Sequence, residues 1–207
     1  MASFSSPPLP VKKSIDSVVF GSSLTKGLDE DLLSRRAKGD VNSRGNNFKV
    51  FSHGGAKIKT IINNIIKVKD DQELNTTIVS RVFIVCGGND VENCYPESDL
   101  DKIIESYNEL CSVATATFPN VSINLCSLIP RRTVYAEHKD RMLWVNDGIE
   151  NFCKSRNIRY VDIFSHFIDH RSGDLSYKLF RGDELHLNQV GSSVLGKVII
   201  AVANRPW

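Results

Sequence analysis

The chain has 207 residues, of which 41% are apolar and 24% are charged, and its formal net charge is +2. This length and composition are typical of one globular domain with a full core. The near-balanced charge, without any block of five or more Lys and Arg residues, gives no indication of nucleic-acid binding, and no apolar run approaches the ~20 residues of a membrane-spanning helix.

Residues 1–14 have neither the basic nor the apolar region of a signal peptide. We therefore expect a flexible leader over residues 1–14 and one folded domain over residues 15–207. The five cysteines include no C-x-x-C pair, which favours a reducing, intracellular compartment and, as an expectation, the cytoplasm. Cys94 falls in a predicted loop, whereas the others occupy apolar strand or helix positions typical of core residues: Cys86, Cys111, Cys126 and Cys153.

The first predicted strand is a short apolar run that ends at Phe20 and breaks at Gly21 into two serines. In an open α/β sheet, ligands bind at the carboxyl ends of the strands, and a glycine lets the backbone turn sharply there. Ser23 is therefore the candidate nucleophile. A short helix is expected over residues 28–33, followed by a polar loop over residues 37–47.

A second strand is predicted over Phe48–Ser52, and it is followed by Gly54 and Gly55. Isoleucines at positions 58, 61, 62 and 65 then predict a helix with one buried face. Gly55 thus lies where a strand leads into a helix amino terminus, at which unpaired N–H groups can bind an anion.

The strongest predicted strand covers Thr77–Cys86 and ends at the sequence Gly-Gly-Asn-Asp, which contains Asn89. A long helix follows from Ser98, for which Ser98 and Asp101 form a candidate capping box.

Two further strands are predicted over Val121–Leu128 and Ile158–Ile163, with a helix around residues 142–153 between them. The last helix is expected to begin near Asn188, a good N-cap residue. Five strands that alternate with helices predict an α/β fold in which a parallel sheet is covered on both faces.

The loop before the last helix carries Asp183 and His186, three residues apart. Together with Ser23 they have the residue types of an acyl-transfer triad, in which His186 takes the proton of Ser23 and Asp183 orients the imidazole. The backbone N–H groups of Ser23 and Gly55 and the side-chain amide of Asn89 could converge on an oxyanion.

These four segments resemble, in order, the sequence blocks of the SGNH hydrolase superfamily, the GDSL-type esterases and lipases. The resemblance implies a flavodoxin-like three-layer α/β/α sandwich with a five-stranded parallel sheet. It also implies hydrolysis of carboxylic esters, often short acyl or acetyl esters, without a metal or an organic cofactor. The matching segments are Gly21-Ser22-Ser23-Leu24, Gly54-Gly55, Gly87-Gly88-Asn89-Asp90 and Asp183-Glu184-Leu185-His186.

Ser22 stands where the family has the aspartate of Gly-Asp-Ser-Leu. This difference leaves open a second hypothesis, a binding module of the same fold that has lost turnover. A narrower resemblance links residues 127–132, Asn146 and residues 159–162 to esterase modules in the first open reading frame of non-LTR retrotransposons. It implies an excised domain or a free-standing relative, and a third hypothesis: a lipid-associated esterase of a nucleoprotein assembly that contacts a membrane peripherally.

In each of these hypotheses the binding partner is a small-molecule or lipid ester, and the oligomeric state stays open. Arg131 and Arg132 follow a predicted strand end, where they either overhang the site or form a solvated pair. The remaining histidines have no carboxylate at a matching spacing and are interpreted as surface or structural residues: His53, His138, His166 and His170.

Overall fold

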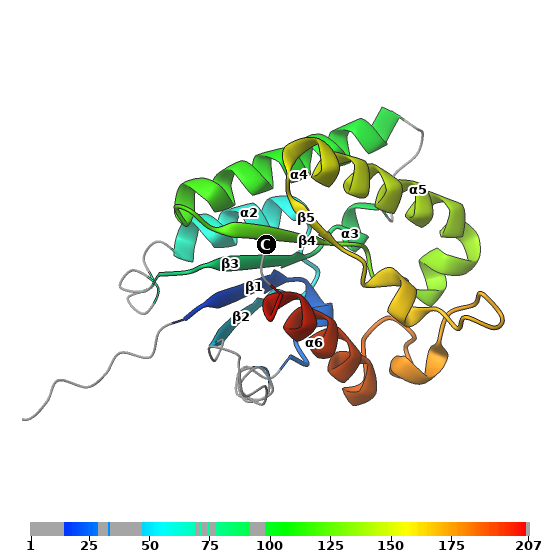
Figure 1. Cartoon of the computed structure of the whole chain (residues 1–207). Helices are drawn as coiled ribbons and strands as arrows, with labels where there is room; N and C mark the ends of the chain where they lie inside the picture. The colour runs from blue at the N-terminus through cyan, green and yellow to red at the C-terminus, as the bar shows by residue number, and fades with distance from the viewer. Residues whose placement is uncertain are drawn as a thin grey trace, which may run out of the picture.

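The computed structural model describes residues 15–28, 33, 47–68, 71, 74, 78–91 and 98–205, without the side chains of Ser98 and residues 132–139 (Figure 1). The expected leader, most of the predicted helix over 28–33 and most of the loop over 37–47 lie outside the described residues. So do Cys94, the capping side chain of Ser98 and the side chain of His138.

The fold is built on a five-stranded parallel sheet with the order β2-β1-β3-β4-β5. The chain starts at an inner strand, crosses to one edge and then returns to build the other side, as in flavodoxin-like sheets. The strands are β1 (Ser17–Gly21), β2 (Phe48–Ser52), β3 (Arg81–Val85), β4 (Ser122–Cys126) and β5 (Arg159–Val161). The predicted α/β fold and parallel sheet are confirmed.

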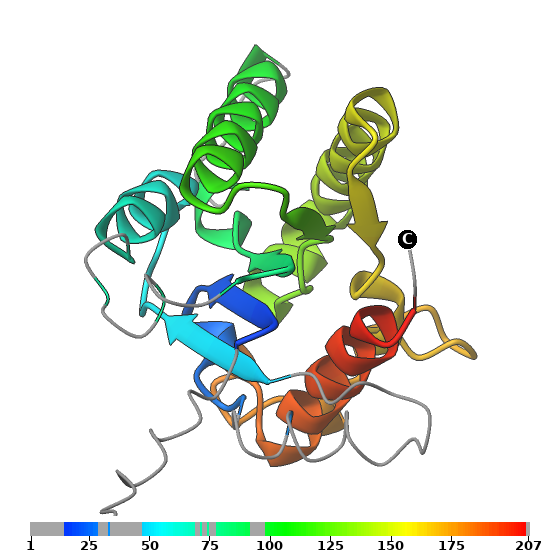
Figure 2. The same cartoon turned by 60° about the vertical axis from the view of Figure 1, so that its left-hand side comes forward.

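Helices cover both faces of this sheet, which gives the expected three layers (Figure 1). In Figure 2, α4 and α5 stand on one side of the strands and α6 lies on the other. The helices are α2 (Ile58–Lys67), α3 (Gly88–Val91), α4 (Ser98–Thr117), α5 (Arg132–Arg156) and α6 (Gln189–Ala203). The short helix α3 was not predicted.

The isoleucine spacing in α2 explains why this helix packs against the sheet. All four predicted isoleucines are buried, in a cluster that includes Val18 and Val82 from the strands. A second cluster on the opposite face joins Val19 and Phe83 to Leu195 and other residues of α6. Neighbouring residues of one strand thus point into different clusters, as the pleat of a strand requires.

Three predicted strands are shorter than expected, two of them because side chains accept the backbone N–H groups at their ends. At the end of β4, the N–H of Leu128 donates to Asn146 Oδ1 over 2.8 Å instead of to a neighbouring strand. The N–H of Ile163, beyond β5, donates to Ser127 Oγ over 2.8 Å. Before β3, Ile78 is 83% exposed, so its apolar side chain does not belong to the buried strand.

The four cysteines expected in the core are all buried and carry free thiols. Burial raises the pKa of Cys111 and of Cys153 to about 12, and raises the pKa values of Cys86 and Cys126 as well. They are core residues, as predicted. Within the described part of the chain, no helix is both long and apolar enough to cross a membrane.

Candidate active site

Three of the candidate residues follow the carboxyl ends of three adjacent strands. Gly21 at the end of β1 is in register with Ser52 of β2 on one side and with Val85 of β3 on the other. Ser23, Gly55 and Asn89 come two to four residues after these positions. The parallel register therefore brings the three segments to one edge of the sheet, as the sequence predicted.

Ser23 opens a short 3-10 helix, η1 (Ser23–Thr25), directly after the break in β1. Thr25 holds this turn, since its Oγ1 donates to the carbonyl of Ser22 over 2.9 Å and lies 2.7 Å from Ser52 Oγ. A side chain at Gly21 would collide with Thr25, so the tight turn requires glycine there. Ser23 is half-buried, whereas Ser22 is only 3% exposed.

Gly55 adopts a left-handed backbone conformation with φ of 67°, which favours glycine although the space around its Cα is open. The turn that contains it leads from β2 into α2. Neither the N–H of Gly55 nor that of Ser23 donates to an acceptor in the part of the chain that the structure describes. Two N–H groups at this edge are thus available to a ligand.

Asn89 is tied to the segment that contains Gly55. Its Nδ2 donates to the carbonyl of Ala56 over 2.9 Å, and its Oδ1 accepts a hydrogen bond of 2.8 Å from Arg131. One hydrogen of the Nδ2 group is used by Ala56, which leaves the other for a ligand.

The neighbouring carboxylate of Asp90 accepts the N–H of Ile58 at the start of α2. Burial raises the pKa of Asp90 above its ordinary value, although the hydrogen bond from Ile58 opposes this shift.

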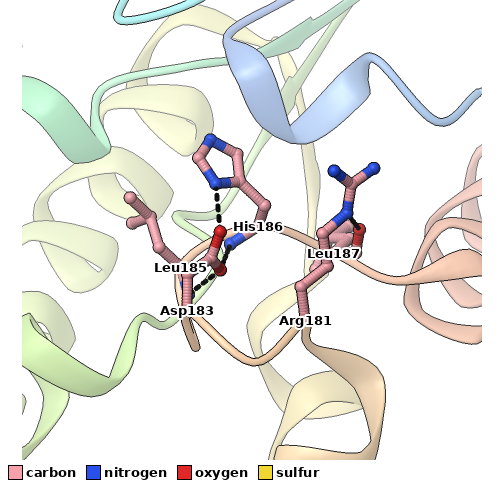
Figure 3. Close-up of polar contacts among 5 residues, drawn as sticks. All are labelled: Arg181, Asp183, Leu185, His186 and Leu187. Atoms are coloured by element: carbon pink, nitrogen blue, oxygen red, sulfur yellow. Dashed lines mark hydrogen bonds and ion pairs between the residues drawn. The ribbon is translucent and has the colours of Figure 1, made fainter.

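Asp183 and His186 form a closed unit on the loop before α6 (Figure 3). Asp183 Oδ2 lies 2.9 Å from His186 Nδ1, while Asp183 Oδ1 accepts the backbone N–H groups of Leu185 and His186 at 2.9 and 2.8 Å. Hydrogen bonds from the backbone and side chain of His186, and from the N–H of Leu185, hold the pKa of Asp183 well below its ordinary value. The carboxylate is therefore ionised over the whole neutral range.

Arg181 closes the base of the loop that carries this pair with one backbone and one side-chain hydrogen bond. The N–H of Arg181 donates to the carbonyl of His186 over 2.8 Å, and Nε of Arg181 donates to the carbonyl of Leu187 over 3.1 Å. Inside the loop Glu184 has a left-handed conformation with φ of 54°. The turn at Glu184 lets Asp183 bond back to the residues that follow it.

Packing connects this loop to the segment of Ser23. Leu24 follows Ser23, Leu187 follows His186, and both leucines are buried in the cluster beneath α6. Within the described residues, however, no hydrogen bond joins Ser23 Oγ to the imidazole. In enzymes without a bound ligand such hydrogen bonds are often long and shorten only in the complex with substrate.

Three cavities in the described part of the chain contain none of the candidate residues in their lining. One cavity, of about 620 Å³, is lined by α4, α5 and the start of β4 at Ser122, at the edge opposite to the candidate site. Another, of about 600 Å³, lies between β5 and α6. The third, of about 550 Å³, is lined by α2 and the end of β2, including Ser52 and His53 near Gly55. None of the five candidate residues lines these cavities, and the side chains of His186 and Asp183 are 36% and 49% exposed. The candidate site is thus shallow and open.

The sequence of residues 19–194 matches the model of the GDSL-like lipase/acylhydrolase family. This match covers most of the chain and contains all the candidate residues. The chain belongs to the GDSL-like lipase/acylhydrolase family. Membership of this family indicates ester hydrolysis as the general class of reaction. No curated relative matches the sequence significantly.

Solved structures agree with this family at the level of the fold. A G-D-S-L family lipolytic protein from Veillonella parvula superposes with a TM-score of 0.68 at 18% identity, covering 93% of this chain and 100% of that one. A lipase/acylhydrolase from Enterococcus faecalis has a TM-score of 0.67 at 14% identity, with 92% and 96% covered. An acetyl xylan esterase has a TM-score of 0.66 at 19% identity, with 90% and 98% covered.

The structure changes one interpretation of this GDSL-like chain and leaves another open. The hypothesis that Arg131 belongs to a solvated arginine pair is wrong, because Arg131 is only 3% exposed and bonded to Asn89. His53 and His170 are exposed, as predicted for surface residues. The narrower resemblance to retrotransposon esterase modules stays a prediction.

Proposed function

We propose that the chain hydrolyses carboxylic esters with short acyl groups, such as acetyl esters, by a triad of Ser23, His186 and Asp183. The observation that carries this proposal is the 2.9 Å contact between Asp183 Oδ2 and His186 Nδ1. An ionised carboxylate can only accept, so Nδ1 carries the hydrogen and Nε2 is left as the basic nitrogen. A serine with such a base is the usual arrangement for nucleophilic acyl transfer.

In the proposed reaction, Ser23 Oγ attacks the ester carbonyl carbon while its proton passes to His186 Nε2. The carbonyl oxygen becomes an oxyanion, for which the N–H groups of Ser23 and Gly55 and the Nδ2 of Asn89 are the proposed donors. The C–O bond to the alcohol then breaks, and the alcohol leaves with the proton from Nε2. A water molecule, deprotonated by His186, attacks the acyl-serine and releases the acid and Ser23.

The central experiment compares the two adjacent serines on a chromogenic acetyl ester. We expect Ser23→Ala to abolish hydrolysis and Ser22→Ala to keep most of it, because Ser22 is buried and only Ser23 matches the nucleophile of the family. Circular dichroism and the melting temperature confirm that both variants are folded. Loss of activity in the Ser22 variant alone would move the nucleophile by one position.

The preference for short acyl groups is supported by the exposure of the site and by the acetyl xylan esterase among the structural neighbours. A shallow site offers little apolar surface to a long chain. We expect kcat/KM to fall across p-nitrophenyl esters from acetyl to palmitoyl. A steady rise along this series would instead support a lipase groove.

The alternative proposal is a binding module, which the serine at position 22 supports as a departure from the family pattern. A fluorophosphonate that labels Ser23 distinguishes the two. Labelling of the wild-type chain and not of His186→Ala supports a working nucleophile. A folded wild-type chain that neither turns over the ester nor reacts with the probe supports the binding module.

A further inference from the structure

Arg131 is a buried charged residue that none of the proposed catalytic steps uses. It follows β4 and directly precedes α5, and its side chain is only 3% exposed. Burial of a cation is costly unless it is paired or hydrogen-bonded. The buried position of Arg131 therefore calls for a structural or functional reason.

Its Nη1 donates a hydrogen bond of 2.8 Å to Asn89 Oδ1. A guanidinium has no acceptor, so the end of the amide that faces Arg131 must be the carbonyl end. The Nδ2 group is thereby turned toward Ala56, to whose carbonyl it donates over 2.9 Å, on the segment that contains Gly55. Arg131 and the carbonyl of Ala56 thus favour the same orientation of the Asn89 amide, and Arg131 holds its oxygen end.

The glycine that precedes Asn89 leaves room for the guanidinium of Arg131. A Cβ at Gly88 would lie 2.9 Å from Nη2 of Arg131 and 3.2 Å from its Cζ, so the guanidinium packs closely on the backbone of Gly88. The stretch from Ser127 to Arg131 is buried throughout. This close packing leaves the guanidinium little room to move.

Three hydrogen bonds hold the segment that leads to Arg131. The N–H of Leu128 donates to Asn146 Oδ1 of α5 over 2.8 Å, and Ser127 Oγ accepts the N–H groups of Ile163 and Phe164, each at 2.8 Å. The segment is thereby fixed to α5 on one side and to the end of β5 on the other. A rigidly placed arginine is suited to orient a neighbouring group.

We infer that Arg131 is a positioning residue for the oxyanion hole: it locks the Asn89 amide with Nδ2 toward the reacting oxygen. This inference rests on the proposed ester hydrolysis and extends it to a residue outside the four family blocks. The fixed positive charge also polarises the amide, which strengthens Nδ2 as a donor. Both effects act through Asn89 and need no contact between Arg131 and the substrate.

The test is a double-mutant cycle with Arg131→Met and Asn89→Ala on an acetyl ester. Loss of one oxyanion donor lowers kcat about 10²- to 10³-fold in a well-studied protease. We expect Arg131→Met to lower kcat about 10- to 100-fold with little change in KM, since the effect is confined to the transition state. In the Asn89→Ala background the same change should cost less than about 2-fold, because the residue through which it acts is gone.

The matched control is Arg159→Met. Arg159 is an arginine whose Nη1 donates to the carbonyl of Val202, between β5 and α6 and away from Asn89. We expect this variant to keep wild-type kcat/KM, with any effect limited to the melting temperature. Arg131→Lys keeps the charge and a group that can only donate, and should keep more activity than Arg131→Gln, whose amide can also accept and no longer requires the oxygen of Asn89 to face it.

A second readout does not depend on turnover. In a spectrum of the 15N-labelled chain, the side-chain amide of Asn89 is assigned by its loss in Asn89→Ala, and it should shift or broaden in Arg131→Met but not in Arg159→Met. A folded Arg131→Met variant with wild-type kcat and an unchanged Asn89 signal overturns the inference. The inference is also overturned if Arg131→Met lowers kcat by the same factor in the Asn89→Ala background as in wild type. If the wild-type chain shows no hydrolysis, the proposed function fails, while the amide signal still decides whether Arg131 orients Asn89.

Discussion

The carboxylate of Asp90 accepts the backbone N–H of Ile58 with both oxygens, at 3.3 and 3.1 Å. It thereby links the residue after Asn89 to the first residue of α2. Burial nevertheless raises the pKa of Asp90. A carboxyl group with a raised pKa in the folded state stabilises the fold fully below its unfolded pKa, and this stabilisation is lost as the pH rises through the folded pKa.

We therefore expect Asp90→Asn, which keeps an acceptor for Ile58 but does not ionise, to gain stability relative to wild type as the pH rises. The difference in melting temperature between the variant and wild type should increase from about pH 4, near the unfolded pKa of an aspartate, and level off above the folded pKa. Thermal unfolding from pH 3.5 to 7.5 measures it. A difference that is constant with pH would show that ionisation of Asp90 does not contribute.

Substitution of His186 and substitution of Asp183 should lower the activity to different extents. His186→Ala removes the proton acceptor of Ser23, so kcat/KM should fall by several orders of magnitude and leave only the catalysis of the oxyanion hole. Asp183→Asn favours the wrong imidazole tautomer, which lowers kcat about 10⁴-fold in serine proteases. Here we expect a smaller loss, of about 10²- to 10³-fold, because both side chains are exposed and water can partly replace the carboxylate.

The pH dependence provides a control for this assignment. The pKa of Asp183 is lowered in the folded protein, so Asp183 stays ionised throughout the acid limb of the rate profile. On the acid side, the plot of log(kcat/KM) against pH should therefore have a limiting slope of one, as for a single ionisation. A slope of two in wild type would contradict the role given to Asp183.

Gly87 should tolerate no side chain. It has φ of 106°, and a Cβ there would collide with the hydroxyl of Tyr107, which donates to the carbonyl of Cys86 over 2.8 Å. Overpacking and the left-handed backbone together should make Gly87→Ala destabilising by roughly 2 to 5 kcal/mol. Gly182→Ala is the matched control, because nothing lies within 4 Å of its added methyl group. Denaturant unfolding of both variants measures the difference, and equal stabilities would rule out the collision.

Asn188 should be needed for more than its capping role. Its Oδ1 accepts the N–H groups of Val190 and Gly191 at 2.9 and 3.0 Å, while its Nδ2 donates to the carbonyls of Lys178 and Phe180 at 2.8 and 2.9 Å. Asn188→Ala should cost about 1 to 3 kcal/mol of stability. Asn188→Asp keeps the cap but directs a carboxylate at two carbonyls, so we expect it to be less stable than wild type. An aspartate variant as stable as wild type would mean that capping alone matters.

The sequence predicted those parts of the structure that depend on local patterns. Isoleucine spacing predicted α2, the segment Phe48–Ser52 was predicted as a strand with the observed bounds of β2, and the Asp-x-x-His spacing predicted the contact between Asp183 and His186. Asn188 was likewise expected at the start of the last helix and is its N-cap. These features involve residues a few positions apart, so a single segment contains the information.

The contact between Arg131 and Asn89 could not be derived in this way, because 42 residues separate its partners. It depends on the parallel pairing of β3 with β4 and on the close packing of Arg131 against Gly88. The early end of β4 is a similar case, since Asn146, which takes the N–H of Leu128, lies 18 residues further along in α5. For the contact between Arg131 and Asn89, the only indication in the sequence was a pair of arginines after a predicted strand.

The buried thiols make local opening of this fold measurable at positions that the chain already contains. Only the thiolate reacts with alkylating reagents, and burial both shields these four sulfurs and disfavours their ionisation. In a Cys94→Ser background, alkylation followed by peptide mass spectrometry would therefore report how often each site opens: Cys86 after β3, Cys111 in α4, Cys126 in β4 and Cys153 in α5. Four reaction rates would divide the molecule into regions that open together and regions that open separately.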